Sequence, residues 1–263
     1  MPDAAALLDW LTGGDAPPAP GAGPDRSADA WALVARVQPG LGVAAARMAR
    51  HAATHPGLDA RTRALVALAL ESVVTNLGFG DVPGAVAAAR AEGATREEVL
   101  EVLALGSIVG MHTGTVGVPA LVGALQARGE DPLAAQLDAR RAELWERYVA
   151  GKRYWTRFTG ELDVFLRGLL ALDPDFFEAY MEWTLQPWLE GTLPPKVREL
   201  VYIAVDVVTT HLYRPGLEVH LDTALRLGAT KEEIMAVYAM AAGFGLRTVS
   251  AGAAALLDEE EVA

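Results

Sequence analysis

Cysteine is absent from this chain of 263 residues, and its absence removes several kinds of chemistry at once. Without a thiol, the protein cannot form disulfide bonds, bind a metal through thiolates or carry out thiol redox catalysis. The sequence also lacks the motif G-x-G-x-x-G, a P-loop and the zinc motif H-E-x-x-H, which argues against a nucleotide or zinc enzyme. We therefore expect no cofactor and no bound metal.

Basic residues are in the minority, because 22 Lys and Arg stand against 34 Asp and Glu and give a net charge of −12. Such a charge repels nucleic acid and anionic membrane surfaces. The longest apolar runs, such as 64–70, are too short to span a bilayer, and the opening residues show no signal-peptide pattern. We expect a soluble cytoplasmic protein that has neither nucleic acid nor a membrane as partner.

Aromatic residues make up only 7% of the chain, and 11 of the 18 fall between Trp145 and Trp188. Large rings bury much apolar area, so we interpret most of this group as filling a contact between two parts of the protein. The alternative is that some of the rings line an apolar ligand pocket.

The sequence repeats itself at an offset of 135 residues. Arg63-Ala-Leu-Val returns as Arg198-Glu-Leu-Val, and Gly93-Ala-Thr-Arg-Glu-Glu98 returns as Gly228-Ala-Thr-Lys-Glu-Glu233. Between residues 61 and 104, about 15 of 44 aligned pairs are identical, which indicates a tandem duplication. Residues that both copies keep are expected to maintain the fold, and residues that one copy keeps are candidates for chemistry.

We divide the chain into four segments. Residues 1–27 would hold a short helix at 4–12 and a Gly- and Pro-rich flexible tether. The first copy of the repeat would occupy 28–128, a helical bridge 129–172, and the second copy 173–263.

Both copies are expected to be helical throughout, since Ala and Leu dominate and no alternating pattern typical of strands is present. Thr95 with Glu98, and Thr230 with Glu233, have the spacing of a capping box at a helix start. A glycine two residues before each Thr suits the left-handed end of the preceding helix. The sequence thus predicts an all-α fold made by tandem duplication of a helical repeat.

A potential acid–base pair occurs in the second copy alone. Glu199 aligns with Ala64, and His220 aligns with Ala85. Both side chains fall on helix faces expected to point inward, where burial and pairing can leave a group titrating near neutrality. The alternative is structural, with His220 as a hydrogen-bonded core residue and Glu199 as a helix-dipole partner.

Three other polar groups have open roles. Asp206 shares a helical stripe with Glu199, but because Glu71 keeps an acid there in the first copy, we expect a shared structural hydrogen bond. His112 aligns with Arg247, and the two could bind a carboxylate or pair across the interface between the copies.

His51 and His55 lie one helical turn apart and could hold a metal, but no third ligand lies near them in the sequence. We interpret them as a solvated helix end.

Three runs stand out in the second copy: Pro195-Lys-Val-Arg-Glu-Leu-Val-Tyr-Ile-Ala204, His220-Leu-Asp-Thr-Ala224 and Leu227-Gly-Ala-Thr-Lys-Glu-Glu-Ile234. They resemble the carboxymuconolactone decarboxylase and alkylhydroperoxidase D-like superfamily. The first copy is similar more weakly, at 61–70 and 92–102. The resemblance implies the helical fold of that superfamily and is less specific for activity.

Peroxidase members of the superfamily carry Cys-x-x-Cys-x-x-x-His, with an upstream Glu that relays protons together with the His. By this resemblance His220 matches the motif histidine and Glu199 the relay glutamate, with two additional residues between them. Tyr213 and Gly216 occupy the cysteine positions, so the chain is not a thiol peroxidase. The decarboxylase branch also lacks the cysteines. The resemblance therefore implies a cofactor-independent lyase or isomerase that acts by proton transfer on a small organic acid.

In this hypothesis His220 is the general acid and base, and Glu199 orients it. The reaction would be a decarboxylation or a related proton transfer beside a carbonyl. Arg247 or His112 would hold a substrate carboxylate. The residues expected to contact the substrate are Tyr202, His211, Tyr213, Arg247 and His112.

The rival hypothesis is a non-catalytic helical ligand-binding or assembly protein that kept the fold. The resemblance also implies self-association. Single-repeat members form trimers or hexamers, so a homotrimer of this double-repeat chain would match a hexamer.

Overall fold

The computed structural model describes residues 5–6, 27–76, 81–151 and 161–262, and every regular element within them is helical. The predicted all-α fold is confirmed. Most of the expected helix at 4–12 and nearly all of the tether lie outside the described residues.

The elements follow one another in the same order in both copies. The first copy contains α2 (Ser27–Val37), α3 (Pro39–Thr54), α4 (Ala60–Ser72), α5 (Val82–Ala91), α6 (Arg96–Ser107), the 3-10 helix η1 (Ile108–Met111) and α7 (His112–Gln126). The second contains α9 (Glu161–Leu172), α10 (Pro174–Leu189), α11 (Pro195–Val207), α12 (Arg214–Arg226), α13 (Lys231–Gly243), the 3-10 helix η3 (Phe244–Leu246) and α14 (Arg247–Val262). Helix α9 takes the place of α2, so the structural repeat includes part of the segment that the sequence assigned to the bridge. The positions equivalent to α8 (Ala139–Tyr148) are residues 4–13, nearly all of which lie outside the described residues.

The repeated Gly-Ala-Thr-x-x-Glu runs form the local structures that their sequence predicts. Thr95 and Thr230 each accept a hydrogen bond from the backbone N–H three residues on, and the Glu there reaches back to close the capping box. Gly93 and Gly228 have φ of 84° and 82°, a conformation that glycine adopts without steric cost. These features start α6 and α13 at equivalent places.

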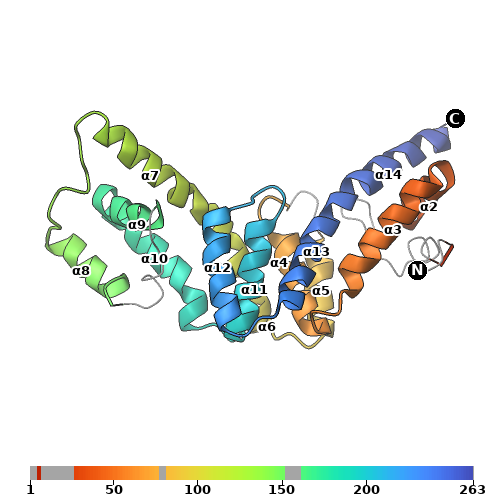
Figure 1. Ribbon diagram of the computed structural model, residues 1–263, viewed down its shortest axis with the longest axis horizontal. Coiled ribbons are helices and arrows are strands. Elements are labelled where there is room, and N and C mark those ends of the chain that lie inside the picture. Colours follow the sequence, from red (N-terminus) through yellow and green to blue (C-terminus); the bar gives the residue numbers. More distant parts are fainter. Residues whose placement is uncertain (1–4, 7–26, 77–80, 152–160, 263) are drawn as a thin grey trace.

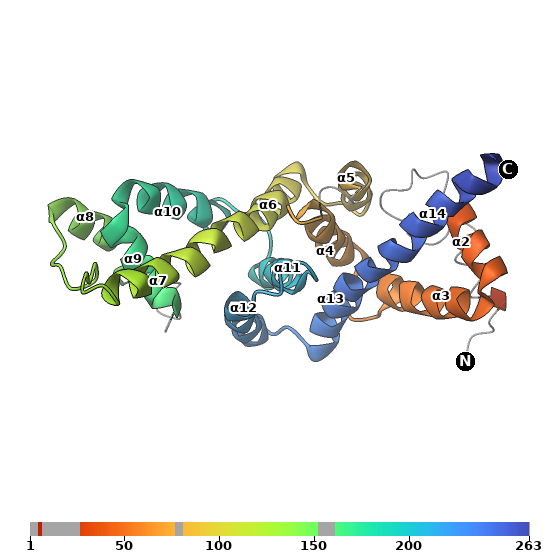
Figure 2. The same cartoon turned by 90° about the horizontal axis from the view of Figure 1, so that it is seen from above.

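The two copies exchange their last helices. Helix α7 of the first copy packs on α9 of the second, and α14 of the second copy packs on α2 of the first, while α4 and α11 contact each other in the centre. Figures 1 and 2 show the result, a central bundle with one arm of helices on each side. Each half therefore contains residues of both copies.

The apolar core is divided in the same way. The largest buried cluster lies in the central bundle and includes most of the apolar side chains of α4 and α11. A second cluster fills the arm formed by α7 to α10, around Phe165, Phe177 and Tyr180. Trp145, Tyr148, Phe165 and Phe177 of the aromatic-rich segment pack in this arm, in agreement with the packing interpretation. Phe176 and Trp183 on α10 are instead exposed.

Two helical stretches, Arg96–Gln126 and Lys231–Leu257, are long and apolar enough to cross a membrane by length and composition. Each consists of two α-helices joined by a 3-10 turn. His112 and Arg247 lie in the middle of these stretches, and each makes a polar contact with the other copy. We interpret both stretches as the helices that connect the central bundle to the arms.

Candidate active site

Helices α11 and α12 bring Glu199 and His220 together. Pro194 and Pro195 start α11, which buries Glu199 completely, and α12 runs back along it with His220 only 8% exposed. The distance from His220 Nδ1 to Glu199 Oε2 is 2.7 Å. A carboxylate at this distance accepts the Nδ1–H proton, which makes Nε2 the ring nitrogen with the lone pair.

Stacked rings fix the plane of the imidazole. Tyr202, one turn after Glu199 on α11, stacks on His220 with ring centroids 4.2 Å apart. Trp188 at the end of α10 stacks in turn on Tyr202, and its Nε1–H donates to the Tyr202 hydroxyl at 3.3 Å. The ring of His220 is thus held by a carboxylate at one nitrogen and by an aromatic face.

The loop between α11 and α12 supplies His211 and Tyr213. It turns back at once, because the Tyr213 N–H donates to the Asp206 carbonyl at 2.9 Å. Leu212 between them has φ 47°, an uncommon conformation for a residue other than glycine. Such strain concentrates at functional sites, where the surrounding structure enforces it.

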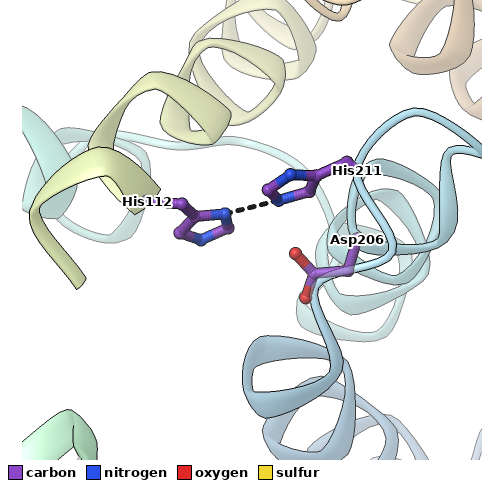
Figure 3. A group of neighbouring side chains, drawn as sticks. All are labelled: His112, Asp206 and His211. Atoms are coloured by element: carbon purple, nitrogen blue, oxygen red, sulfur yellow. Dashed lines mark hydrogen bonds between the residues drawn. The ribbon is translucent and has the colours of Figure 1, made fainter. Parts of the chain in front are cut away.

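His112 enters the same site from the first copy, at the start of α7. Its ring stacks on Tyr213 with centroids 4.1 Å apart, and its Nδ1 lies 2.6 Å from His211 Nε2 (Figure 3). Burial, followed by the nearby charges of His211 and His220, lowers the pKa of His112 to about 3. Burial also lowers the pKa of His211. Both imidazoles are therefore neutral at physiological pH.

A cavity opens between these groups. It offers about 50 Å³ to the centres of water-sized molecules, which corresponds to roughly three to five waters and suits a small ligand. Its walls combine the candidate acid–base residue with rings and hydroxyls from both copies: Ile108, His112, Thr115, Leu162, Tyr180, Thr184, Tyr202, Val205, Asp206, Tyr213, Gly216, Val219 and His220.

Asp206 differs from the structural role expected for it. Glu71, its counterpart, accepts hydrogen bonds from the Asp81 N–H and the Arg247 guanidinium. Asp206 is 2% exposed, and its Oδ2 has no hydrogen-bond partner among the described residues. Burial, and then the charge of Glu199, raise the pKa of Asp206 well above its ordinary value. The shared structural hydrogen bond is therefore not observed.

Gly216 makes room for the Asp206 carboxyl. A Cβ at this position would lie 2.6 Å from Asp206 Oδ2 and 2.8 Å from the Tyr213 ring. Any larger residue at this position would clash with both side chains, so glycine allows Asp206 and Tyr213 to occupy their places in the cavity wall.

Two of the predicted contact residues, His211 and Arg247, do not line this cavity. His211 lies next to it, in contact with His112, whereas Arg247 is elsewhere. Arg247 pairs with Glu71 in the other half of the molecule. This pair is equivalent by the repeat to the contact that His112 makes with the second copy. Arg247 therefore has the second of the two roles considered, pairing across the interface between the copies. Of these two residues, only His112 lies in the cavity with His220. Ala64 and Ala85 replace the acid–base pair in that half, which explains why only one half has this site.

His51 lies on α3 and His55 follows directly after this helix. Their ring centroids are 5.1 Å apart. His51 is exposed, and His55 Nδ1 accepts the Gly57 N–H at 3.2 Å. This arrangement agrees with the solvated helix end that we expected.

The sequence did not single out the hydroxyl-bearing residues that α7 and α10 add to the cavity. Thr115, Tyr180 and Thr184 reach it because α7 packs on α9 and because α10 continues from that arm to the start of α11. The one available sign was that Tyr180 belongs to the aromatic-rich segment, for which a pocket was the alternative interpretation.

Fold and site together define an all-α tandem-repeat protein in which one half holds a buried His–Glu pair at a cavity. The chain belongs to the carboxymuconolactone decarboxylase family, whose model matches residues 39–130 and 174–259, one match in each copy. This confirms the family resemblance and the tandem duplication.

A solved structure supports the same assignment. It is a protein of Burkholderia xenovorans LB400 that carries the provisional name gamma-carboxymuconolactone decarboxylase subunit. It is 35% identical in sequence to this chain, has a TM-score of 0.78, and the match covers 99% of this chain and 98% of that one. No curated protein matches the chain.

Proposed function

We propose that the protein is a lyase or isomerase that moves a proton on a small organic acid, with decarboxylation as the reaction. The contact of 2.7 Å between His220 Nδ1 and Glu199 Oε2, in the wall of a small cavity, is the observation that supports this proposal most. The name of the structural relative agrees with it.

Proton transfer takes place at His220 Nε2. In a decarboxylation the bond between carbon and the carboxylate breaks, carbon dioxide leaves, and the electron pair moves into a conjugated carbonyl as an enolate. Because Nε2 carries a lone pair at rest, it first takes up a proton from water, and the resulting imidazolium delivers that proton to the carbon and returns to its Nδ1-protonated form. Glu199 keeps the Nδ1 proton in place and balances the charge of the imidazolium, as the carboxylate partner of a catalytic histidine does.

The cavity selects a small substrate with both apolar and polar parts. Tyr202 and Tyr213 contact its rings or carbon chain. Thr115 and Thr184 donate their hydroxyl protons to the His112 and Tyr180 carbonyls, so their oxygens offer acceptors to the substrate. His211 stands beside them, in contact with His112. A neutral His112 donates a hydrogen bond to a substrate oxygen, and because it carries no charge it does not bind anions non-specifically. In the proposed chemistry none of these residues needs a cofactor.

The second candidate is the non-catalytic binding protein, and the exposed rings of Phe176 and Trp183 on α10 are the observation that favours it. The test is to supply γ-carboxymuconolactone to the protein in deuterated water and to analyse the product by mass spectrometry. The proposed enzyme releases carbon dioxide and places one solvent deuterium in each product molecule. A substrate that stays intact, or a product without deuterium, would refute the acid–base function and leave a binder.

Soluble cytoplasmic localisation and assembly into a homotrimer remain proposals. Exposed apolar side chains on the arm helices, Val116 and Leu121 on α7 and Leu256 on α14, would suit contacts between copies. Sedimentation equilibrium would measure the mass of the assembly.

A further inference from the structure

Three groups that bind metals in proteins converge where α7 meets α11. His112 comes from the first copy, and Asp206 and His211 come from the second, with their ligand atoms all within 4.8 Å of one another. Figure 3 shows the Asp206 carboxylate extending from α11 toward the two rings. We propose that these residues bind a divalent transition-metal ion. Two imidazoles and one carboxylate are a donor set suited to Zn²⁺, Fe²⁺ or Co²⁺.

The two ring nitrogens are already close to a shared position. His112 Nδ1 and His211 Nε2 lie 2.6 Å apart. Two nitrogens bound to one zinc at about 2.0–2.1 Å in tetrahedral geometry are roughly 3.3 Å apart. Separation of the two nitrogens by less than about 1 Å, together with a rotation of the rings that directs both lone pairs at one ion, would convert the contact into a pair of ligands.

The carboxyl group gives a second, independent sign of a cation. Asp206 Oδ2 is buried without a hydrogen-bond partner among the described residues. A buried carboxyl oxygen without a partner is destabilising and is rare in folded proteins. A bound cation would give this oxygen its partner.

The duplication shows what a cation does at the equivalent place. An offset of 135 residues aligns Asp206 with Glu71 and His112 with Arg247. In that half the guanidinium of Arg247 pairs with the Glu71 carboxylate. The half with two histidines has no such fixed cation at Asp206 among the described residues, and a metal ion would provide the equivalent positive charge.

The ion would face the substrate. His112 and Asp206 line the same cavity as His220, so three protein ligands would leave a coordination position open toward it. A carboxylate or carbonyl oxygen of the substrate fits that position, and the substrate class becomes organic acids that bind a metal through oxygen. This last step rests on the proposed function, whereas metal binding itself does not.

The sequence led us to expect no metal. It gave little sign of this cluster, because His112 lies 94 residues before Asp206 and in the other copy (206 − 112 = 94). The exchange of helices between the copies brings them together.

The test is a calorimetric titration of the untagged, chelator-treated chain with Zn²⁺, without substrate. We expect one ion per chain, and we expect Asp206→Asn and His211→Gln each to weaken zinc affinity by at least about 10-fold. The matched control is the double variant His51→Gln with His55→Gln, which removes two histidines outside the cluster and is expected to bind zinc like the wild type. Cobalt(II) absorption provides a second readout of the ligand geometry.

Equal zinc affinity in the wild type and both site variants would overturn the proposal, as would loss of binding in the control alone. The two variants lie on different elements, one on α11 and one on a loop, so misfolding of one leaves the other as a test. Because binding is measured without turnover, failure of the metal site and failure of the proposed proton transfer give separate results.

Discussion

Replacement of His220 by Gln is expected to reduce decarboxylation by about 10²- to 10⁴-fold, the usual contribution of a positioned acid or base. Gln fills a similar space and can keep a hydrogen bond to Glu199, so the fold should be retained. It cannot exchange a proton at neutral pH. Steady-state kinetics of carbon dioxide release, with circular dichroism as the check on folding, measures the effect.

The matched control for this variant is His51→Gln, the same substitution at an exposed histidine outside the site. It should leave the rate within a factor of about two, because a surface change far from the cavity rarely alters stability or geometry. If His220→Gln retained the wild-type rate, another residue would have to move the proton and the assignment would be wrong.

Replacement of Glu101 by Ala is expected to have the largest effect on stability. Glu101 on α6 binds Arg198 Nε at 2.7 Å and accepts the N–H groups of Thr192 and Leu193, which join α10 to α11. The variant leaves a buried guanidinium and two backbone donors without this carboxylate. Breaking a buried pair by removing one partner costs about 3–5 kcal/mol. Urea unfolding followed by circular dichroism measures the loss.

Glu97→Ala is the control, because Glu97 lies one turn earlier on the same helix and is exposed. It should change the free energy of unfolding by no more than about 1 kcal/mol, the contribution of an exposed carboxylate in the first turn of a helix. A loss for Glu101→Ala as small as that of the control would show that the pair between the copies does not hold α6 against α11.

The sequence predicted the parts of this fold that depend on neighbouring residues. Capping boxes, left-handed glycines and helix starts arise from contacts within a few positions, and the repeat made each of them visible twice. Alignment of the copies also predicted Glu199 and His220, because an acid and a base replace two alanines on faces that are otherwise apolar.

The rest depends on contacts across the chain. His112 meets His211 only because α7 of the first copy packs on the second copy, and helical periodicity does not specify which copy a helix joins. For the same reason Arg247 has Glu71 as its partner instead of a place in the cavity. Asp206 was expected to share the role of Glu71, but its environment depends on Gly216 and the loop before α12.

The central claim is that Glu199 holds the Nδ1 proton of a buried His220, so that Nε2 exchanges protons with the substrate. Nitrogen-15 NMR of histidine-labelled protein tests it most directly, since the two ring nitrogens have different shifts when protonated and when not. We predict at neutral pH the form with its proton on Nδ1, and loss of that preference in Glu199→Ala. A His220 protonated on Nε2 alone, or one unchanged by Glu199→Ala, would contradict the account.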